Sequence, residues 1–500
     1  MKKELLFKPF VLFGAILDKI VFTHVLVLGL PTILYYCVLV NGGDLIALHL
    51  LIPVLYVITS IVVMGEALAT VAAYRSFLRY RPQRGILQKW VGRNFEHRRV
   101  TQAPAVTAPE LETPSSTLIV AAYLPNEQDI IFETLEYILG TIHRPAAGFE
   151  LILAYNRPER LPIEDELEKL AAQYPELVLL NVEGSRSKAE NVNAALQIVR
   201  GEVTGILDAD HRPNPDCFDR AWRWLATGQY AAVQGRNVIR NYRENFLTRM
   251  IGVEFECMYG VSHPAKSLLV DTGMFCGSNG YWRTSILRRI RFSHQMLTED
   301  IDATLRALLR GHNIMHDPGI ITTELAPTTV KAFWSQRKRW AQGWMEVALK
   351  HQMPLIRSRR LDNWQKVYWS MLLIYSAAFH FIALQVFPMF IGLTLSQLEA
   401  PVIAQEYVWF TTGMTLLSGP IQALAAWGVR SRVTKQSAGD YLLYCLAIPF
   451  YCIFKNVIAI IAIYDHFTGD RAWVVTARGK QPSIPPVALP SYAEMQDKAS

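Results

Sequence analysis

Two aspartates that directly follow a short apolar run are the first residues in this sequence that could do chemistry. The apolar run, residues 203–207, ends in Asp208 and Asp210. This pattern predicts a buried strand that delivers both carboxylates to the carboxyl edge of a sheet, where α/β folds bind ligands. Two hard oxygen ligands at this spacing suit Mg²⁺ or Mn²⁺, which keep several waters and also bind a substrate phosphate. The alternative is a solvated acidic turn before Pro213, because turns are rich in aspartate.

A second acidic group, Thr298-Glu299-Asp300, has the form of a helix start. Thr298 would be the N-cap, and the two acids would lie in the first turn, where the helix dipole favours negative charge. On its own, this pattern indicates only an ordinary helix N-terminus.

A third group of polar and aromatic residues follows Thr328 and Thr329, either of which could cap the next helix. Four residues of that helix are spaced i, i+3, i+4 and i+7 along one face: Gln336, Arg339, Trp340 and Gly343. Alternatively, the helix is amphipathic and lies on a membrane, with Arg337, Lys338 and Arg339 directed toward lipid phosphates.

The elements that must position these residues form an α/β pattern. Strand-like runs occupy residues 118–123, 151–155, 177–182 and 203–207, and helical patterns occupy residues 163–174 and 188–199. Strands that alternate with helices at this spacing predict a mainly parallel sheet. No Walker A or G-x-G-x-x-G sequence follows the first strand, which argues against a P-loop or dinucleotide site.

The composition indicates a membrane protein with a large polar insert. The chain has 500 residues, of which 51% are hydrophobic, and its mean hydropathy is +0.16. A net charge of +7 is modest for this length and does not imply a nucleic-acid partner. The six cysteines show neither C-x-x-C nor zinc-ligand spacing, so we expect free thiols in a reducing compartment.

Long apolar runs at residues 20–40, 45–74, 367–395 and 407–429 are long enough to span a bilayer. Lysines and arginines flank the first pair, which by the positive-inside rule places the N-terminus and the middle of the chain in the cytoplasm. The last run, residues 441–454, stops at Lys455-Asn456 and predicts only a partial crossing. We therefore expect five regions: a transmembrane hairpin (1–80), a basic juxtamembrane segment and linker (81–117), a cytoplasmic α/β domain ending in interfacial helices (118–350), a second transmembrane region (351–465) and a tail (466–500).

Taken together, three motifs in this order between membrane spans resemble the signature of processive family-2 glycosyltransferases, such as cellulose, chitin and hyaluronan synthases. The motifs are Asp208-Ala209-Asp210, Thr298-Glu299-Asp300 and Gln336-Arg337-Lys338-Arg339-Trp340. The sequence around these motifs is most similar to the curdlan synthase-like branch. The resemblance covers roughly residues 118–350 and implies a GT-A-like domain inserted between transmembrane helices of the plasma (inner) membrane.

The resemblance also implies roles for individual residues. Asp208 and Asp210 would hold Mg²⁺ or Mn²⁺, and Asp300, with Glu299 beside it, would be the catalytic base. The nucleotide and diphosphate would contact Tyr123, Glu127, Asn156, Lys188, Asp208 and Arg339. The acceptor sugar would contact Cys276, Gly277, Ser278, Thr298, Gln336 and Trp340. Asn156 departs from the cellulose synthase pattern, which has paired aspartates at this point.

The tail contains Trp473, Thr476 and Arg478, whose spacing is similar to a gating loop that related synthases hold over the active site. The alternative is an interfacial tail with an aromatic anchor. The sequence thus predicts an inverting enzyme that polymerises a β-linked polysaccharide, with β-1,3-glucan from UDP-glucose favoured, and threads it across the bilayer. The alternatives are an aminosugar or hyaluronan-like polymer made from UDP-N-acetylglucosamine, transfer of one sugar to a lipid, and sugar binding without catalysis.

Overall fold

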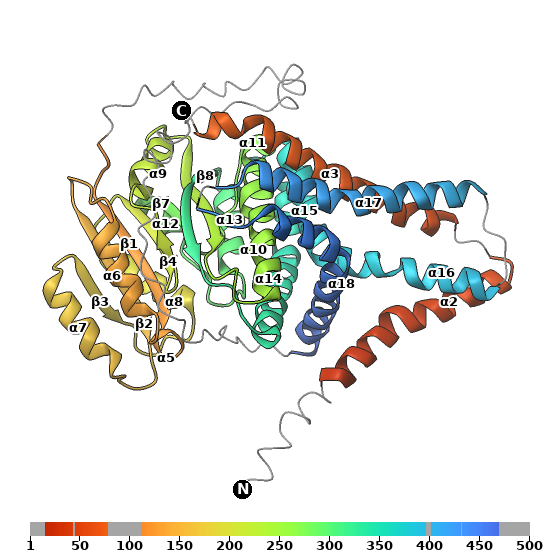
Figure 1. The fold of residues 1–500 in the computed structure, drawn as a ribbon, viewed down its shortest axis with the longest axis horizontal. Coiled ribbons are helices and arrows are strands. Elements are labelled where there is room, and N and C mark those ends of the chain that lie inside the picture. The colour runs from red at the N-terminus through yellow and green to blue at the C-terminus, as the bar shows by residue number, and fades with distance from the viewer. Residues whose placement is uncertain (1–15, 44–45, 79–111, 397–401, 432, 470–500) are drawn as a thin grey trace, which may run out of the picture.

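A computed structural model describes residues 16–43, 46–78, 112–396, 402–431 and 433–469. One end of the molecule is built around a β-sheet and contains residues 116–357, here called the sheet domain. Long helices from both ends of the chain extend away from it (Figure 1). The predicted class, an α/β domain inserted between apolar helices, is confirmed.

The sheet has eight strands in the order β3-β2-β1-β4-β7-β6-β8-β5. The strands are β1 (Ser116–Tyr123), β2 (Phe149–Asn156), β3 (Leu177–Asn181), β4 (Val203–Asp208), β5 (Arg212–Pro213), β6 (Tyr230–Ile239), β7 (Gly280–Arg283) and β8 (Asn313–Glu324). The pairs β1–β2, β2–β3, β1–β4 and β6–β8 are parallel, whereas β7 is antiparallel to both β4 and β6 and β5 is antiparallel to β8. The four predicted strands therefore form the parallel half of the sheet.

Helices cover both faces of the sheet, which explains why the parallel strands β1, β2 and β4 are mainly apolar. The helices of the domain are α5 (Leu124–Glu127), α6 (Ile131–Thr141), α7 (Ile163–Gln173), α8 (Lys188–Ile198), α9 (Cys217–Leu225), α10 (Phe246–Cys257), the π-helix η2 (Met258–Ser262), α11 (His263–Val270), α12 (Thr284–Ile290), α13 (Glu299–Leu309) and α14 (Val330–Arg357). Along β1, Leu118 and Val120 pack with α6, α7 and α9, whereas Ile119 and Ala121 pack with α8, α12 and α13. This alternation follows from the two-residue period of a strand.

The remaining helices form the apolar part of the molecule. They are helical residues 16–24, η1 (Val25–Gly29), α2 (Leu30–Val40), α3 (Ile46–Leu78), α15 (Asn363–Leu384), α16 (Val386–Ser396), α17 (Val402–Gly428) and α18 (Ala438–Thr468). Within the described ranges, four stretches have the length and composition to cross a membrane: Ile16–Val40, Leu51–Tyr74, Asn363–Ser396 and Ala438–Thr468. The predicted span at 407–429 coincides with α17, which runs beside α3 but is not one of these four (Figure 1).

The predicted interruption at Lys455-Asn456 is wrong, because α18 continues unbroken to Thr468. Both polar residues have partners inside the protein: Lys455 binds Glu254 of α10, and Asn456 bonds to His380 of α15. A polar pair that is satisfied by its neighbours does not need to end a helix.

Both ends of α18 lie against the sheet domain. Just before its start, the backbone carbonyl of Lys435 accepts a hydrogen bond from Tyr242 at 2.7 Å. Near its end, Asp465 forms an ion pair with Lys338 of α14. In Figure 1, α18 accordingly stays near the domain, whereas α2, α16 and α17 reach the far end of the molecule.

Candidate active site

The sequence-predicted residues line one cleft of about 780 Å³ at the carboxyl edge of the parallel strands. Fourteen of them line this cleft: Tyr123, Glu127, Asn156, Lys188, Asp208, Cys276, Gly277, Ser278, Thr298, Glu299, Asp300, Gln336, Arg339 and Trp340. Asp210 does not line it, and Trp473, Thr476 and Arg478 lie outside the described residues. The parallel pairing of β1 with β4 places Ala121 opposite Asp208, and this register puts Tyr123 and Asp208 at the same edge.

Asp208 and His211, which line the cleft, and the buried Asp210 beside them form the group that could hold a metal ion. Their ligand atoms all lie within 4.8 Å of one another. The Asp208 side chain is 30% exposed, whereas Asp210 is fully buried and accepts hydrogen bonds from the backbone of Leu325 and, at 3.0 Å, from His211. Carboxylate oxygens at this spacing fit a hard divalent cation such as Mn²⁺ or Mg²⁺.

His211 is a site residue that the sequence reasoning missed, although it directly follows the acidic pair. Its Nδ1 faces Asp210 and its Nε2 lies 2.8 Å from Glu324, which also lines the cleft. Burial alone would lower the pKa of His211, but the two carboxylates raise it to about 9. His211 therefore links β4 to the end of β8 and fixes the orientation of Asp210.

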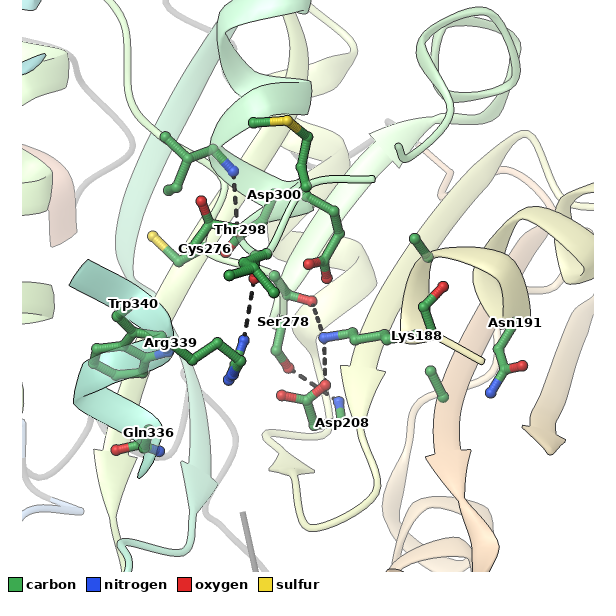
Figure 2. Close-up of a pocket in the computed structure, with 18 of the residues that line it drawn as sticks. Lys188, Asn191, Asp208, Cys276, Ser278, Thr298, Asp300, Gln336, Arg339 and Trp340 are labelled. Carbon is green, nitrogen blue, oxygen red and sulfur yellow. Dashed lines mark hydrogen bonds and ion pairs between the residues drawn. The ribbon is translucent and has the colours of Figure 1, made fainter. Parts of the chain in front are cut away.

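Lys188, at the start of α8, contacts both Asp208 and the turn of residues 276–278. Its ammonium forms an ion pair with Asp208 and donates to the carbonyl of Gly277 at 2.6 Å (Figure 2). The Ser278 hydroxyl accepts from the backbone N–H of Asp208 at 3.1 Å. A cation held at this point can neutralise a departing diphosphate.

The turn of Cys276, Gly277 and Ser278 is supported by Gln234 of β6, a fully buried side chain that sequence reasoning also missed. Its carbonyl oxygen accepts from the Cys276 N–H at 2.9 Å, and its amide donates to the Ser278 carbonyl at 2.9 Å. Gly277 has φ +84°, and a Cβ there would lie 3.0 Å from Oδ2 of Asp300. The turn thus requires glycine both for its backbone conformation and for its approach to Asp300.

Asp300 lies in the first turn of α13, and Thr298 is at the N-cap position as predicted, although its side chain makes no capping hydrogen bond. Burial raises the pKa of Asp300, and the neighbouring charge of Glu299 raises it further, while Lys188 and Arg339 lower it, giving a value of about 7. A carboxylate with a pKa near neutrality is suited to accept a proton and release it again.

The start of α13 is fixed against α14 by a buried carboxylate, Asp302. It accepts hydrogen bonds from Lys350 at 2.7 Å, from His351 at 2.8 Å and from Arg306 at 2.7 Å. Burial alone would raise the pKa of Asp302, but these three donors hold it well below its usual range. The spacing of the acidic group predicted a helix start; the clamp beneath it was not predicted.

Helix α14 presents the predicted face to the cleft. Thr329 caps the helix by accepting from Ala332 N–H at 3.2 Å, and Gln336, Arg339 and Trp340 line the cleft (Figure 2). Arg339 donates to the carbonyl of Leu297 at 3.4 Å. The alternative, that Arg337 and Lys338 reach lipid phosphates, is wrong, because they form ion pairs with Glu254 and Asp465.

The opposite end of the cleft is closed by amide side chains. Asn156 donates to the Ser185 carbonyl at 2.9 Å and accepts from Asn191 at 2.8 Å, and Asn191 also donates to the Ala122 carbonyl. Glu127 accepts from the backbone N–H of Tyr123 at 2.6 Å. This end is hydrogen-bonded and polar, and it is neutral at Asn156, where an aspartate would add a charge.

Comparison with known proteins identifies the domain that carries this cleft. Residues 204–422 match the family model described as glycosyl transferase family group 2. This part of the chain is therefore similar to family-2 glycosyltransferases. It is 27% identical over 221 residues to glucomannan 4-beta-mannosyltransferase 1 of Oryza sativa, which covers 43% of this chain and 42% of the relative. It is 25% identical over 270 residues to the poly-beta-1,6-N-acetyl-D-glucosamine synthase of Staphylococcus aureus, covering 52% of this chain and 61% of the synthase.

The chain thus spans about half the length of the curated relatives it matches. Among solved structures, a mannosyltransferase from Pyrobaculum calidifontis, in complex with GDP-Man and Mn²⁺, has the same fold. The TM-score is 0.50 at 19% identity, with 82% of this chain and all of that chain covered. At this identity, the similarity concerns the fold.

Proposed function

We propose that this protein is a metal-dependent, inverting glycosyltransferase that polymerises a β-linked polysaccharide from a UDP-sugar. The observation that carries the proposal is a cleft, in the described part of the chain, that brings together Asp208, Lys188, the near-neutral carboxylate of Asp300 and the aromatic face of α14, with Asp210 buried beside it. We favour β-1,3-glucan from UDP-glucose, on the resemblance to curdlan synthase-like sequences.

Each of these residues would have a separate role in the reaction. Asp208 and Asp210 would hold Mg²⁺ or Mn²⁺, which supplies charge neutralisation at the diphosphate. Lys188 and Arg339 meet the remaining negative charge, Arg339 with a planar guanidinium suited to phosphate. Asp300 takes the proton of the acceptor hydroxyl. At the same time the oxygen of that hydroxyl bonds to C1 of the donor sugar, and the bond from C1 to the diphosphate breaks, so that the nucleoside diphosphate leaves. One displacement inverts the anomeric configuration.

The acceptor chain would lie along the turn of Cys276, Gly277 and Ser278 and against Gln336, Thr298 and Trp340. An indole ring offers a flat apolar face to the C–H side of a sugar. The nucleotide would occupy the end formed by Tyr123, Glu127 and Asn156. The charge of Glu299, next to the base, would raise the pKa of Asp300.

The sheet domain would be cytoplasmic and the apolar helices would cross the plasma membrane, with region boundaries near residues 80, 117, 350 and 465. The contacts at both ends of α18 support this layout, since they hold both ends of this helix beside the sheet domain. Trp473, Thr476 and Arg478 would then be on the side where a gating loop could act. The polymer would be elongated at this face and threaded outward.

A second candidate is a polymer of an aminosugar made from UDP-N-acetylglucosamine. The match to the poly-beta-1,6-N-acetyl-D-glucosamine synthase favours it. Transfer of a single sugar to a lipid is the third, and the product length separates it from the first two.

The test is donor use by the full chain in nanodiscs. UDP-glucose, UDP-N-acetylglucosamine, UDP-glucuronate and GDP-mannose are supplied singly and mixed, with Mn²⁺ or Mg²⁺, and nucleotide release and product length are measured. Long product from UDP-glucose that a β-1,3-glucanase digests is the expected result. Long product only from an aminosugar donor would transfer the assignment to the second candidate, and nucleotide release by Asp300→Asn at the wild-type rate would overturn the assignment of the base.

A further inference from the structure

Arg337, between Gln336 and the cleft-lining Arg339 and Trp340, is turned away from solvent. It is 7% exposed and forms an ion pair with Glu254 of α10. Its guanidinium carbon lies over the Trp340 ring, 4.3 Å from the centroid, and over the Phe333 ring at 5.0 Å. A guanidinium in this position is attracted by the faces of both rings.

Glu254 is a shared anchor rather than a simple counter-ion. Besides Arg337, it accepts a hydrogen bond from Tyr451 at 2.8 Å and one from Lys455 at 2.8 Å, both on α18. The cluster therefore joins α10, α14 and α18, and its carboxylate is satisfied from three directions. A buried charge with this many partners has one stable geometry.

This geometry determines how Trp340 is presented to the cleft. Arg337 is three residues before Trp340, so it lies on the same side of α14 and covers one face of the indole. Trp340 itself is one of the residues that line the cleft (Figure 2). A ring backed by a fixed cation cannot change rotamer freely, which reduces the entropy lost when a ligand stacks on it.

We propose that Arg337, held by Glu254, is the positioning residue for Trp340 and thereby sets the affinity for the acceptor sugar. This rests on the proposed function, because it assumes that Trp340 binds a saccharide. Lysine cannot replace Arg337 in this role, since an ammonium keeps the charge but lacks the planar group that lies flat on the indole.

Lys338 provides a matched control on the adjacent position. It forms an ion pair with the fully buried Asp465 of α18, so it also joins α14 to α18. If Arg337 only attached α14 to α18, Lys338→Met and Arg337→Lys would have similar effects; if it positions Trp340, only Arg337→Lys weakens acceptor binding.

The experiment uses the full chain in nanodiscs and the donor that supports nucleotide release. A β-linked trisaccharide of the same sugar is the acceptor probe: laminaritriose for glucose or chitotriose for N-acetylglucosamine. Its KM in turnover and its Kd by calorimetry are measured alongside the Kd for UDP. For Arg337→Lys, we expect a rise of tenfold or more in the acceptor KM and Kd, with the Kd for UDP within twofold of wild type; for Lys338→Met, both stay within twofold.

Two further variants distinguish a loss of Trp340 positioning from a general folding defect. Glu254→Gln should raise the acceptor Kd in the same direction, and in a Trp340→Ala background Arg337→Lys should change it by less than twofold. An Arg337→Lys protein with a wild-type acceptor Kd, or with equal losses for acceptor and UDP, would overturn the inference. Absence of turnover by the wild type with every donor would instead overturn the proposed function, and trisaccharide Kd values that did not separate Arg337→Lys from Lys338→Met would overturn the inference in that case too.

Discussion

Gly343 of α14 is the position where a single methyl group should disturb catalysis most selectively. It faces Thr298, the residue directly before Glu299 and Asp300. A Cβ at Gly343 would lie 2.4 Å from Cγ2 and 2.6 Å from Oγ1 of Thr298. The substitution Gly343→Ala therefore tests whether the close approach of α13 and α14 holds the catalytic carboxylate in place.

The size of the effect follows from these distances. Carbon atoms in contact normally lie about 3.5–4.0 Å apart, so Thr298 must move by roughly 1 Å. Threonine is β-branched and has few rotamers to escape into, and Asp302 ties the same helix to α14 through His351. A shift of about 1 Å in reacting groups can cost about 100-fold in rate, and overpacking of this kind costs about 1–3 kcal/mol of stability.

We therefore expect Gly343→Ala to lower kcat for nucleotide release about 100-fold. The Kd for UDP should stay within about twofold, because the end of the cleft proposed to bind the nucleotide is built on β1, β2 and α8. Nucleotide release, calorimetric UDP binding and thermal unfolding are the three measurements. Combining Gly343→Ala with Thr298→Ala removes the overlapping atoms, so the double variant should be more active than Gly343→Ala alone.

The control is the same substitution in a helix with open space. A Cβ at Gly140 of α6 meets nothing within 4 Å, so Gly140→Ala should leave activity unchanged and stabilise the fold by up to about 1 kcal/mol. A Gly343→Ala protein with wild-type kcat would refute the reasoning, as would equal losses of kcat in both variants.

Three further outcomes follow from the charges in the cleft. Glu299→Gln removes a charge that raises the pKa of Asp300 above its ordinary value. We expect the acid limb of the pH–rate profile near pH 7 in the wild type and at lower pH in the variant. An unmoved limb would exclude Asp300 as the titrating base. Asp302→Asn should lower the free energy of unfolding by about 2 kcal/mol at neutral pH. Because the pKa of Asp302 is depressed in the folded state, this contribution is present above about pH 4 and is lost as the pH falls. The unfolding temperatures of variant and wild type should therefore converge in acid, and a constant difference would contradict the role of Asp302 in joining α13 to α14. EDTA should abolish nucleotide release and Mn²⁺ should restore it, while Asp208→Asn should raise the half-saturating Mn²⁺ concentration at least tenfold; an unchanged requirement would remove Asp208 from the site.

Much of the fold and the candidate site was predictable because local patterns carry the information. An apolar run ending in Asp208 predicted the strand and the edge at which the cleft lies, and three of the four residues predicted at helical spacing, Gln336, Arg339 and Trp340, line the cleft. The interruption at Lys455-Asn456 was not predicted correctly, because whether a polar residue ends a helix depends on partners far away in the chain. Lys455 finds such a partner in Glu254, 201 residues away.

The sequence by itself determined which residue types follow each strand, where the sheet helices begin, and that long apolar helices flank the domain. These are local properties, governed by hydrophobic period, capping and helix length. Only the tertiary structure decided which charges meet. Arg337 and Lys338 could equally have faced lipid, and His211 could have been a turn residue. The packing of α10, α14 and α18 and the pairing of β5 with β8 brought their carboxylate partners to them. The physical reason is that burying a charge is favourable only beside a partner, and the partner's position is a property of the whole fold.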